Sequence, residues 1–199
     1  VALANDLLTR FPVIDELINN AGNLATGEKK TISDGVEENF AVNVIAPLIL
    51  TRKLVPALKA ASPTGRVQIT SGGTPFDTMD VNDLEGTKKA VGIPAYSHSK
   101  RVMEAMAIAL SRELEPVGIL VNVVGGGLPG ATSMTKVIAY KDMPFVTKPF
   151  YPMFKWFMRR DDGGASAKKC AAPVVWAALA NSEELGTGKS FLSAPKEEK

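Results

Sequence analysis

Residues 118–124 read GILVNVV, a glycine followed by six residues of which one, Asn122, is polar. A continuous apolar run of this length is typical of a strand that is buried on both faces, as strands are in a parallel sheet. Further strands are predicted at GRVQITS (65–71), IDELINN (14–20) and GKSFL (188–192). Each run lies next to glycine or asparagine residues that favour turns.

Helical patterns lie between these strands. Hydroxyl and acidic residues at 31–34 predict a helix start, and helical periodicity then continues to about Ala61. Residues 95–115 and the alanine-rich residues 164–181 are also predicted to be helical. Because strands that alternate with helices form βαβ units, we predict an α/β fold with a doubly wound parallel sheet, as a single domain over residues 1–199.

The N-terminal residues VALANDLLTRF (1–11) carry leucines at helical spacing and are typical of the tail of an amphipathic helix. Val1 is not an initiator methionine. We therefore expect the chain to begin partway through a domain, so that the predicted sheet is N-terminally incomplete.

The composition excludes several classes of site. The net charge is +2 with both signs interspersed, which gives no reason to expect a nucleic-acid partner. One cysteine, Cys170, and one histidine, His98, exclude a cysteine-based zinc site and a His-rich metal site within the chain, so no metal is predicted. No apolar run reaches the ~18 residues of a membrane span. The scarcity of cysteine is compatible with a reducing compartment.

Two glycine-rich segments resemble phosphate-binding motifs without completing them. GTGKS (186–190) matches the end of a P-loop, but the first glycine of that motif would fall at Glu183 and few residues remain for the helix that should follow. We interpret it as a tight turn before a strand. GGGLPG (125–130) satisfies G-x-G-x-x-G, yet residues near 150 carry neither the acid nor the strand that a dinucleotide fingerprint requires. A loop over the substrate or cofactor is the preferred interpretation.

Asn43 lies on an apolar stripe of the long predicted helix. The stripe is spaced four, three and four residues apart, and its members are Val36, Phe40, Asn43 and Pro47. These residues share one helix face that should be directed to the core, where an amide must be hydrogen-bonded. Asn43 is either a structural amide that holds a kink at Pro47 or a polar group directed toward a site.

Ser71, Tyr96 and Lys100 are candidate chemical groups. Ser71 ends the predicted strand 65–71, and ligands of open parallel sheets bind at the carboxyl ends of the strands. Tyr96 and Lys100 are four residues apart and share a helix face, so the ammonium would lower the phenol pKa from ~10 toward neutrality. Such a phenol can serve as a general acid or base. The alternatives are a strand-terminating serine and an ordinary pair on the helix surface, while His98 lies off that face.

Together these residues resemble the short-chain dehydrogenase/reductase family, because four signals follow one another in the order of that family. They are NNAG (19–22) after a strand, Asn43 in NFAVNV, Ser71 at the end of GRVQITS, and the YxxxK motif formed by Tyr96 and Lys100. The long interval between Ser71 and Tyr96, and the aromatic segment PFYPMFKWFMRR (149–160), resemble the retinol-dehydrogenase-like branch. The resemblance covers nearly the whole chain and implies a Rossmann-like fold.

The resemblance also implies a role for each matched residue. Tyr96 would transfer the proton to or from the substrate oxygen, and Lys100 would lower the Tyr96 pKa and bind the nicotinamide ribose. Ser71 would hold the substrate oxygen, and Asn43 would anchor a water that relays protons to Lys100. The segment near the adenosine side of the cofactor would be Asn19, Asn20, Ala21 and Gly22. The cofactor would be NADP or NAD, with NADP favoured by the resemblance.

Three features depart from the family pattern. The glycine-rich cofactor loop of the family is not present upstream of NNAG. After VNVV, the pair Pro129 and Gly130 comes later than expected. Either Gly126 takes the proline position and Thr132 binds the cofactor carboxamide, or the loop is rearranged. Glu16 falls in a predicted buried strand, where a lone carboxylate is costly, so it should lie at the strand end or be exposed.

We therefore predict an NAD(P)-dependent oxidoreductase that interconverts a lipophilic alcohol and a carbonyl. Residues 143–160 would cover the site and offer an apolar pocket. Alternatively, this aromatic and basic segment is a surface lid or a stretch that touches a membrane surface. The helix 95–115 is apolar on most sides, which allows burial against the sheet and against a second copy in a homodimer. We expect the protein to be cytoplasmic or peripheral to a membrane.

A second hypothesis is a non-catalytic remnant or interaction protein that cannot bind the dinucleotide. Without the glycine-rich loop, the pyrophosphate has no helix N-terminus to bind, and the strand 14–20 would be an exposed edge able to pair with another chain. A hydrolase is a poor interpretation, since the chain has no G-x-S-x-G and its only histidine is poorly placed for a triad.

Overall fold

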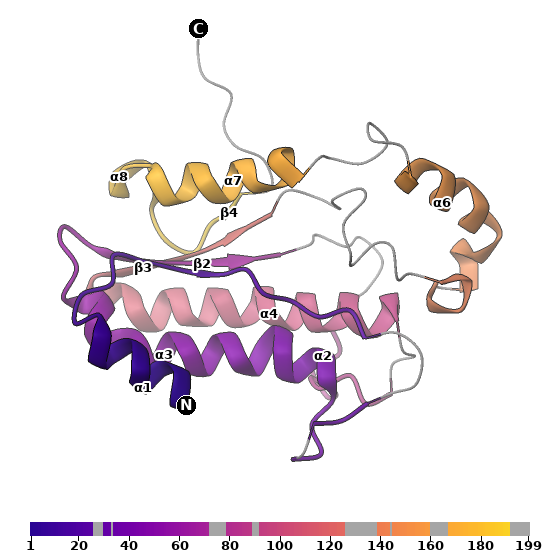
Figure 1. The fold of residues 1–199 in the computed structure, drawn as a ribbon, viewed down its shortest axis with the longest axis horizontal. Coiled ribbons are helices and arrows are strands. Elements are labelled where there is room, and N and C mark those ends of the chain that lie inside the picture. Colours follow the sequence, from indigo (N-terminus) through magenta and orange to yellow (C-terminus); the bar gives the residue numbers. More distant parts are fainter. Residues whose placement is uncertain are drawn as a thin grey trace, which may run out of the picture.

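A four-stranded parallel sheet lies at the centre of the structure (Figure 1). The computed structural model describes residues 1–25, 30–32, 34–71, 79–88, 92–125, 139–143, 145–159 and 167–191. The strands lie in chain order as β1 (Glu16–Asn19), β2 (Gly65–Thr70), β3 (Ile119–Val124) and β4 (Ser190–Phe191). The predicted α/β fold with a parallel sheet is confirmed.

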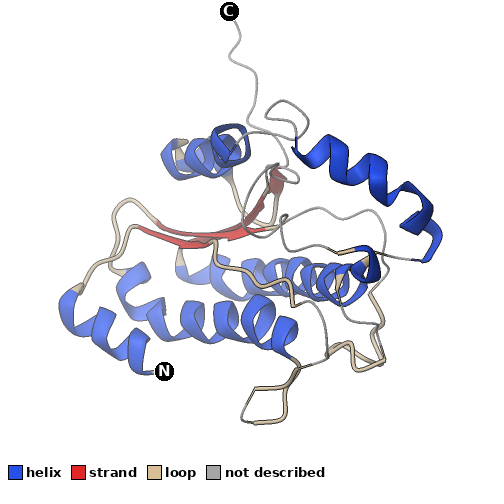
Figure 2. Ribbon diagram, turned by 45° about the vertical axis from the view of Figure 1, so that its right-hand side comes forward, coloured by secondary structure: helices blue, strands red, loops and turns tan. Residues whose placement is uncertain are grey.

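Helices cover both faces of the sheet (Figure 2). One face is covered by α1 (Ala2–Arg10), α3 (Ala46–Lys59) and α4 (Ile93–Leu114), and the other by α7 (Ala167–Leu179) and α8 (Ser182–Leu185). The helix α6 (Tyr151–Arg159) stands on the side toward which the strand arrowheads point (Figure 1). Ligands of open parallel sheets bind at that end of the strands, so α6 lies beside the expected ligand crevice.

The central strand β3 packs against both helical layers. Val121 belongs to a buried cluster with Leu54 of α3 and Leu110 of α4. Val124 belongs to a second cluster, which includes Ala177 of α7. Fully burying a side chain of this kind stabilises the fold by about 1.5–3 kcal/mol. The continuous apolar run of GILVNVV therefore follows from a strand that has no face in water.

The long helix after β1 starts later than the sequence predicts. Its first segment, α2 (Glu38–Phe40), is capped by Glu37, whose carboxylate accepts a hydrogen bond from the Phe40 N–H at 2.8 Å. Thr31 instead forms an isolated antiparallel bridge with Glu37. The earlier start is wrong because Gly35 adopts a left-handed φ of +79°, which a right-handed helix does not contain.

A π-helical turn, η1 (Ala41–Ile45), follows α2 and carries Asn43. The Ala46 N–H bonds to the Ala41 carbonyl, which lies five residues back. Pro47 has no N–H with which to form the α-helical bond to the Asn43 carbonyl. The irregularity expected at Pro47 is therefore a π turn, a feature that is frequent at functional sites.

One helical stretch among the described residues, Glu38–Lys59, is long and apolar enough to cross a membrane by length and composition. It consists of α2, η1 and α3 in succession. Leu54 and Leu58 within it are fully buried in the cluster that includes the sheet. Of its most apolar window 44% is buried, and since core helices pass the same test, length and composition do not assign this helix to a membrane.

The long interval between Ser71 and Tyr96 forms an insert, of which the structure describes residues 79–88. This insert is hydrogen-bonded to neighbouring helical segments. His98 Nε2 lies 2.9 Å from the Asp83 carbonyl oxygen and 3.2 Å from the next carbonyl oxygen, and since both are acceptors this nitrogen carries the hydrogen. Glu85 Oε1 accepts a hydrogen bond from the Glu37 N–H at 2.7 Å. His98 was expected to lie outside the chemistry, and in the structure it is a buried anchor for this loop.

Other element boundaries differ from the prediction by a few residues. The predicted helix 164–181 corresponds to α7, and the separate turn α8 follows it. The Glu184 N–H of α8 donates to Asn181 Oδ1 at 2.7 Å. Gly186 and Gly188 adopt positive φ angles of 60° and 70°, so GTGKS is a tight turn before β4, as predicted. Three short helices complete the described structure: η2 (Glu115–Val117), η3 (Tyr140–Asp142) and η4 (Phe145–Phe150).

Candidate active site

Asn43 is fully buried and joins the segment after β1 to α4. Its Oδ1 accepts a hydrogen bond from the Asn23 N–H at 2.8 Å, and its Nδ2 donates to the Asn23 carbonyl and to Ser99 Oγ, both at 2.9 Å. Ser99 Oγ in turn donates to the Tyr96 carbonyl at 2.8 Å. The side chain of Asn43 therefore fixes the backbone around Tyr96, and its function as a water anchor stays a prediction.

Lys100 is buried at the end of β2. Its Nζ donates to the Thr70 carbonyl at 3.0 Å, and lies 3.8 Å from Met103 Sδ and 5.8 Å from the centroid of the Tyr96 ring. Burial lowers the pKa of Lys100 from 10.5 to about 8, and the carboxylate of Glu104, one helical turn away, opposes this shift. The ammonium form still dominates at neutral pH.

Tyr96 is buried in a small apolar cluster with Leu24 and Met143. Tyr151 and Phe154 of α6 pack against this cluster, so α6 contributes to the surroundings of the phenol. Burial raises the pKa of Tyr96 from 10 to about 12. The expected decrease toward neutrality is not found, because burial disfavours the charged phenolate.

The hydroxyl of Ser71 is directed to α4. It donates a hydrogen bond to Glu104 Oε1, and Glu104 Oε2 accepts a second bond from Arg101 Nη1 at 2.8 Å. Ser71 lies directly after β2 and next to Thr70, which binds the Lys100 ammonium. The structure therefore brings Ser71, Lys100 and Asn43 to the carboxyl ends of β1 and β2, as predicted, and places an unexpected carboxylate on the serine.

The first residues of NNAG have different environments. Asn19 is buried at the end of β1, and its Nδ2 donates to Thr51 Oγ1 of α3 at 3.1 Å. Asn20 and Ala21 are exposed beyond the end of the strand. Asn19 thus supports the sheet, as expected, while the contact of these residues with a cofactor stays a prediction.

Gly22 lies against the two central polar groups of the site. A methyl group at this position would lie 3.3 Å from Lys100 Nζ and 3.4 Å from Asn43 Oδ1. The ammonium and the amide oxygen therefore flank the same backbone atom, and a larger residue would displace one of them. This close approach is the physical reason for a glycine after Asn-Asn-Ala.

The remaining predicted cofactor residues, Pro129, Gly130 and Thr132, lie outside the described residues, as does Gly126. Their roles stay predictions.

Four contributing residues were missed by sequence reasoning: Asn23, Thr70, Ser99 and Glu104. The first two act through backbone groups, for which side-chain identity gives no signal. Glu104 could have been found, since it lies four residues after Lys100 and eight after Tyr96 on the same helix stripe.

The arrangement places a neutral phenol and a cation at the end of a parallel sheet. Such a pair can deliver a proton to a substrate oxygen, while the cation stabilises the negative charge that develops on the phenol oxygen.

Comparison with known sequences assigns the family. The sequence model of the short chain dehydrogenase family matches residues 1–142, well over half of the chain. The chain belongs to the short-chain dehydrogenase family. The family resemblance that the four sequence signals predicted is therefore confirmed.

Similar curated proteins include retinol dehydrogenases, in agreement with the predicted branch. Retinol dehydrogenase 14 of Homo sapiens is 29% identical over 155 residues, which are 78% of this chain and 45% of that protein. Retinol dehydrogenase 13 of Homo sapiens is 30% identical over 181 residues, which are 89% of this chain and 52% of that protein. This short-chain dehydrogenase therefore spans about half the length of the curated relatives it matches.

Solved structures support the fold of this short-chain dehydrogenase. An NAD+-bound xylitol dehydrogenase matches with a TM-score of 0.66 at 19% identity, over 98% of this chain and 73% of that chain. The RhlG/NADP complex of Pseudomonas aeruginosa matches with a TM-score of 0.62 at 21% identity, over 96% of this chain and 68% of that chain. At these identities the likeness concerns the fold alone.

Proposed function

We propose that this chain carries the proton-transfer part of an NAD(P)-dependent oxidoreductase that interconverts an alcohol and a carbonyl. The proposal rests on one observation, the buried phenol of Tyr96 beside the Lys100 ammonium, with Asn43 holding the backbone of that helix turn. The nicotinamide cofactor supplies or accepts a hydride. NADP is favoured over NAD by the family resemblance alone.

The residues present fit a ribose of the cofactor next to Lys100. An ammonium has three N–H donors, and among the described residues the Thr70 carbonyl and the Met103 sulfur take two of them. The remaining donor suits a ribose hydroxyl. Gly22 allows close approach at this point, because it has no side chain to cover the ammonium.

In the reducing direction, Tyr96 donates its phenolic proton to the carbonyl oxygen of the substrate. A pKa of about 12 keeps the phenol protonated at neutral pH, which suits a proton donor. Lys100 stabilises the phenolate that forms, since its ammonium lies 5.8 Å from the ring centroid. In the oxidising direction, the phenolate form of Tyr96, which the Lys100 ammonium stabilises, takes the proton of the alcohol.

The proposal is tested by following nicotinamide absorbance while the intact protein is supplied with NADP or NAD and straight-chain secondary alcohols or their ketones. We expect turnover with at least one cofactor. Failure of both cofactors with every alcohol and ketone, in protein that binds the dinucleotide, would contradict the proposal.

We further propose that the substrate is lipophilic. Tyr96 lies in a cluster with Leu24 and Met143, against which Tyr151 and Phe154 pack, so the phenol is approached through apolar side chains. Each CH₂ buried in such a pocket is worth about 0.8 kcal/mol. The kcat/KM value should therefore rise roughly fourfold per CH₂ in a series of secondary alcohols until the pocket is filled. Equal kcat/KM values along the series of alcohols would contradict an apolar pocket.

We propose that η4 and α6 touch an anionic membrane surface. Their exposed apolar side chains are Phe145, Val146, Phe150, Met153 and Trp156. Lys148 and Lys155 lie among them, with Nζ atoms 5.6 Å and 5.5 Å from the ring centroids of Tyr140 and Tyr151. Aromatic side chains flanked by lysines are typical of helices that lie in the interface of a bilayer.

Vesicle sedimentation tests this membrane contact. Wild-type protein should sediment with vesicles that contain phosphatidylserine, and the Phe145→Asp variant should sediment less. Leu179→Asp is the matched control, because Leu179 is 80% exposed and Phe145 is 86% exposed, yet Leu179 lies on α7. Equal losses in both variants would contradict a contact through η4 and α6.

We also propose a homodimer in which α4 contacts a second copy of the chain near the open end of the sheet, where Ile108, Val121 and Ser190 line one cavity. Ile108 is exposed there, although it is flanked by buried residues such as Ala107 and Leu110. Ile108→Asp should shift the sedimentation velocity of the protein toward the monomer. An unchanged dimer, or a wild-type monomer, would contradict this interface.

A second candidate function, an interaction protein without catalysis, is favoured by the open edge of β1. This strand pairs only with β2 among the described strands, and Ile18 on it is 41% exposed. Fluorescence titration with NADPH separates the two candidates. Binding at micromolar concentration supports the oxidoreductase, whereas an absence of binding supports the interaction protein.

A further inference from the structure

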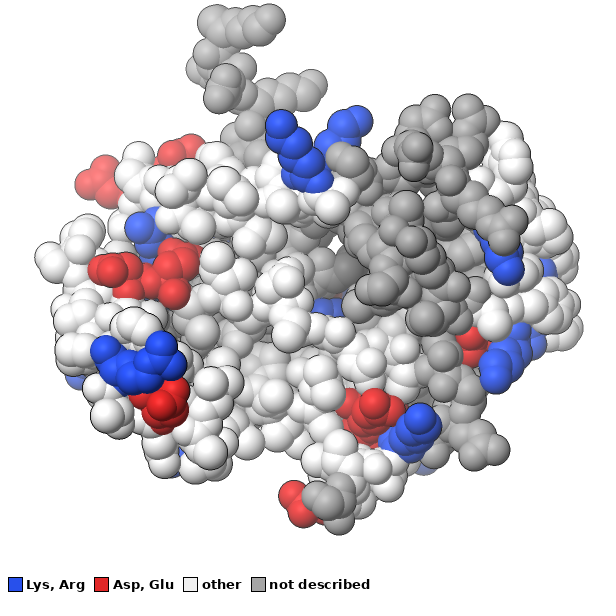
Figure 3. Space-filling view, viewed as in Figure 1, with Lys and Arg blue, Asp and Glu red and all other residues white. Residues whose placement is uncertain are grey.

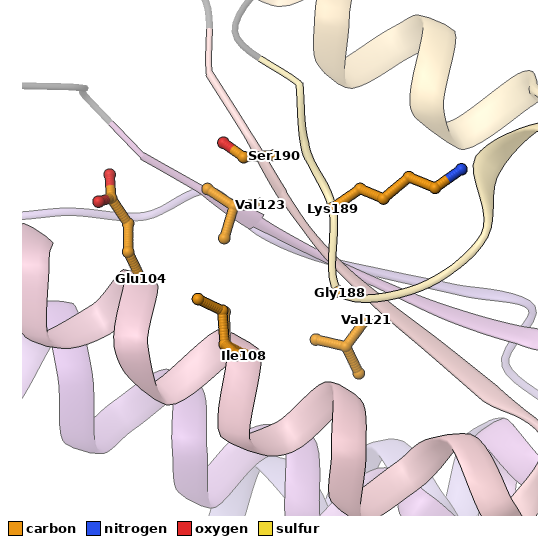
Figure 4. A pocket seen from close by; sticks show the side chains of 8 residues that line it. Glu104, Ile108, Val121, Val123, Gly188, Lys189 and Ser190 are labelled. Atoms are coloured by element: carbon orange, nitrogen blue, oxygen red, sulfur yellow. The ribbon is translucent and has the colours of Figure 1, made fainter.

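A carboxylate and an ammonium of α4 are both hydrogen-bonded to the carboxyl end of β2. Lys100 Nζ donates to the Thr70 carbonyl at 3.0 Å, and the Ser71 hydroxyl donates to Glu104 Oε1. Thr70 and Ser71 are consecutive, and Lys100 and Glu104 lie four residues apart on α4, so their side chains share one helix face. Figure 4 shows Glu104 rising from α4 with its carboxylate directed toward the end of β2. Two opposite charges are therefore held at neighbouring points of one strand end.

The surroundings of Glu104 tolerate a carboxylate. Glu104 Oε2 accepts a hydrogen bond from Arg101 Nη1 at 2.8 Å, and the Glu104 side chain is 22% exposed. Glu104 also lines a cavity of about 130 Å³ together with Ile108 and Val123 (Figure 4). The bond from Arg101 and this opening offset the cost of placing a charged group beside buried side chains. The carboxylate can therefore lie close to the buried Lys100 without being a fully buried charge.

Glu104 is the charge that opposes the effect of burial on Lys100. Burial lowers the pKa of Lys100 to about 8, and the Glu104 carboxylate raises it. Among the described residues, the groups that face the ammonium from other elements carry no charge. They are the Thr70 carbonyl of β2 and, across Gly22, the Asn43 amide of η1.

The other neighbours of Lys100 on α4 do not favour its ammonium form as a negative charge would. Tyr96 is protonated at neutral pH, and the Met103 thioether is uncharged. Arg101 is a cation, and a like charge disfavours a nearby ammonium. Within the described part of the chain, the support for the positive charge of Lys100 therefore comes from Glu104.

The charge of Lys100 matters most when Tyr96 gives up its proton. The phenolate that forms is stabilised by the ammonium and loses that stabilisation when Lys100 is neutral. Because the pKa of Lys100 is about 8, a modest decrease would leave much of the lysine uncharged at neutral pH. Loss of the Glu104 charge would cause such a decrease, since burial would then act without opposition.

We propose that Glu104 is a positioning residue that keeps Lys100 in its ammonium form, through a negative charge held one helical turn away at the end of β2. The inference rests on the proposed function, since proton donation by Tyr96 is the step that needs the cation. It extends that function by naming the side chain that sets the upper pH limit of turnover.

Carbon-13 NMR titration of protein labelled at lysine Cε measures the titration midpoint of Lys100 without substrate or cofactor. The Lys100 resonance is identified by its loss in Lys100→Met. Glu104→Gln keeps an oxygen acceptor for the Ser71 hydroxyl but removes the charge, so the Lys100 midpoint should fall by about 0.5–1 pH unit. Glu104→Asp keeps the charge, and its midpoint should lie closer to that of the wild type.

The matched control is Glu113→Gln. Glu113 also lies on α4 and pairs with an arginine, at 2.7 Å from Arg52, yet its loss should leave the Lys100 midpoint unchanged. If Glu104→Gln does not fold, Arg101→Gln tests the same field with the opposite sign. Removal of this cation should raise the Lys100 midpoint, and a fall would contradict the inference.

The pH profile of kcat for ketone reduction, at saturating NADPH, gives a second readout. Turnover should fall as Lys100 loses its proton, and the midpoint of this fall should lie about 0.5–1 pH unit lower in Glu104→Gln than in the wild type. A merely structural role of Glu104 would lower kcat by the same factor at every pH and leave the midpoint in place.

An unchanged Lys100 midpoint in folded Glu104→Gln, or an equal fall in Glu113→Gln, would overturn the inference. Wild-type protein that binds the dinucleotide but turns over no alcohol or ketone would overturn the proposed function. In that case, a lower Lys100 midpoint in Glu104→Gln would still support the control of Lys100 by Glu104.

Discussion

At the scale of single residues, the site is a set of polar groups held in an apolar environment. Sequence patterns predicted Asn43, Ser71, Tyr96 and Lys100 as site residues. The structure places them near one end of the sheet, and their roles stay predictions. The patterns did not predict the direction of the Tyr96 pKa. That direction depends on desolvation by Leu24, Met143 and α6, which are distant in sequence.

The buried lysine should make stability depend on pH. The folded pKa of Lys100 is about 8 and the unfolded value is 10.5, so the unfolded state binds more protons between these values and the free energy of unfolding rises with pH. The rise should be up to about 3 kcal/mol between pH ~8 and ~10, before Tyr96 begins to ionise in the unfolded state.

Urea denaturation at a series of pH values measures this rise. It should disappear in Lys100→Met and persist in Lys53→Met, a change of an exposed lysine on α3. The test is the slope of the free energy of unfolding against pH. The absolute free energy is not the test, because methionine cannot bind the Thr70 carbonyl. A slope that survives in Lys100→Met would assign the pH dependence to another group.

At the scale of elements, periodicity predicted each of the four strands and the helices α4 and α7, with boundaries shifted by a few residues. It did not predict the π turn η1, since a shift from four to five residues leaves the apolar stripe almost unchanged. Nor did it predict that His98 anchors the insert 79–88, because that contact depends on the path of a loop without periodicity.

Gly86 in that loop and Gly118 directly before β3 separate the effect of a clash from that of backbone strain. Both adopt positive φ angles, of 72° and 81°, but a methyl group at Gly86 would lie 2.8 Å from His98 Cδ2, and one at Gly118 would meet nothing within 4 Å. Gly118→Ala should lower the free energy of unfolding by about 1 kcal/mol, from strain alone.

Gly86→Ala should cost roughly 1–3 kcal/mol more than Gly118→Ala, because the buried imidazole cannot move aside. Chemical denaturation of both variants measures the difference. Equal losses would show that the insert is not held against His98 as the structure describes.

At the scale of the whole molecule, the order of strands and helices predicted the parallel sheet and the end at which the site lies. Charge is mixed over the face shown in Figure 3, where basic and acidic side chains lie next to one another. The sequence predicted that Glu16 lies at a strand end or is exposed. It is the first residue of β1 and half-buried, with Arg66 Nε 3.3 Å from its Oε2. The ion-pair partner of Glu16 could not be predicted, since it depends on the register between β1 and β2.

Glu16 should make the sheet edge sensitive to pH. Burial raises its pKa from 4.5 to about 7 against the opposing effect of Arg66. Because the folded state binds more protons between these values, this contribution to stability is present below pH ~4.5 and is lost as pH rises through ~7. The loss should be at most about 3 kcal/mol.

Thermal unfolding between pH ~5 and ~8 measures this loss. Glu16→Gln should flatten the decrease in stability, whereas Glu113→Gln, at an exposed ion pair, should leave it unchanged. A decrease that persists in Glu16→Gln would place the titrating group elsewhere in the molecule.

The central claim is that Tyr96 transfers the proton, and the most direct test is the turnover of Tyr96→Phe beside that of Tyr140→Phe. Tyr140 is 53% exposed on η3, so its hydroxyl should be dispensable. We predict that kcat falls by about 10²–10⁴-fold in Tyr96→Phe, with NADPH binding within about twofold of the wild type, and that Tyr140→Phe retains full activity. Turnover of Tyr96→Phe at the wild-type rate would contradict the account.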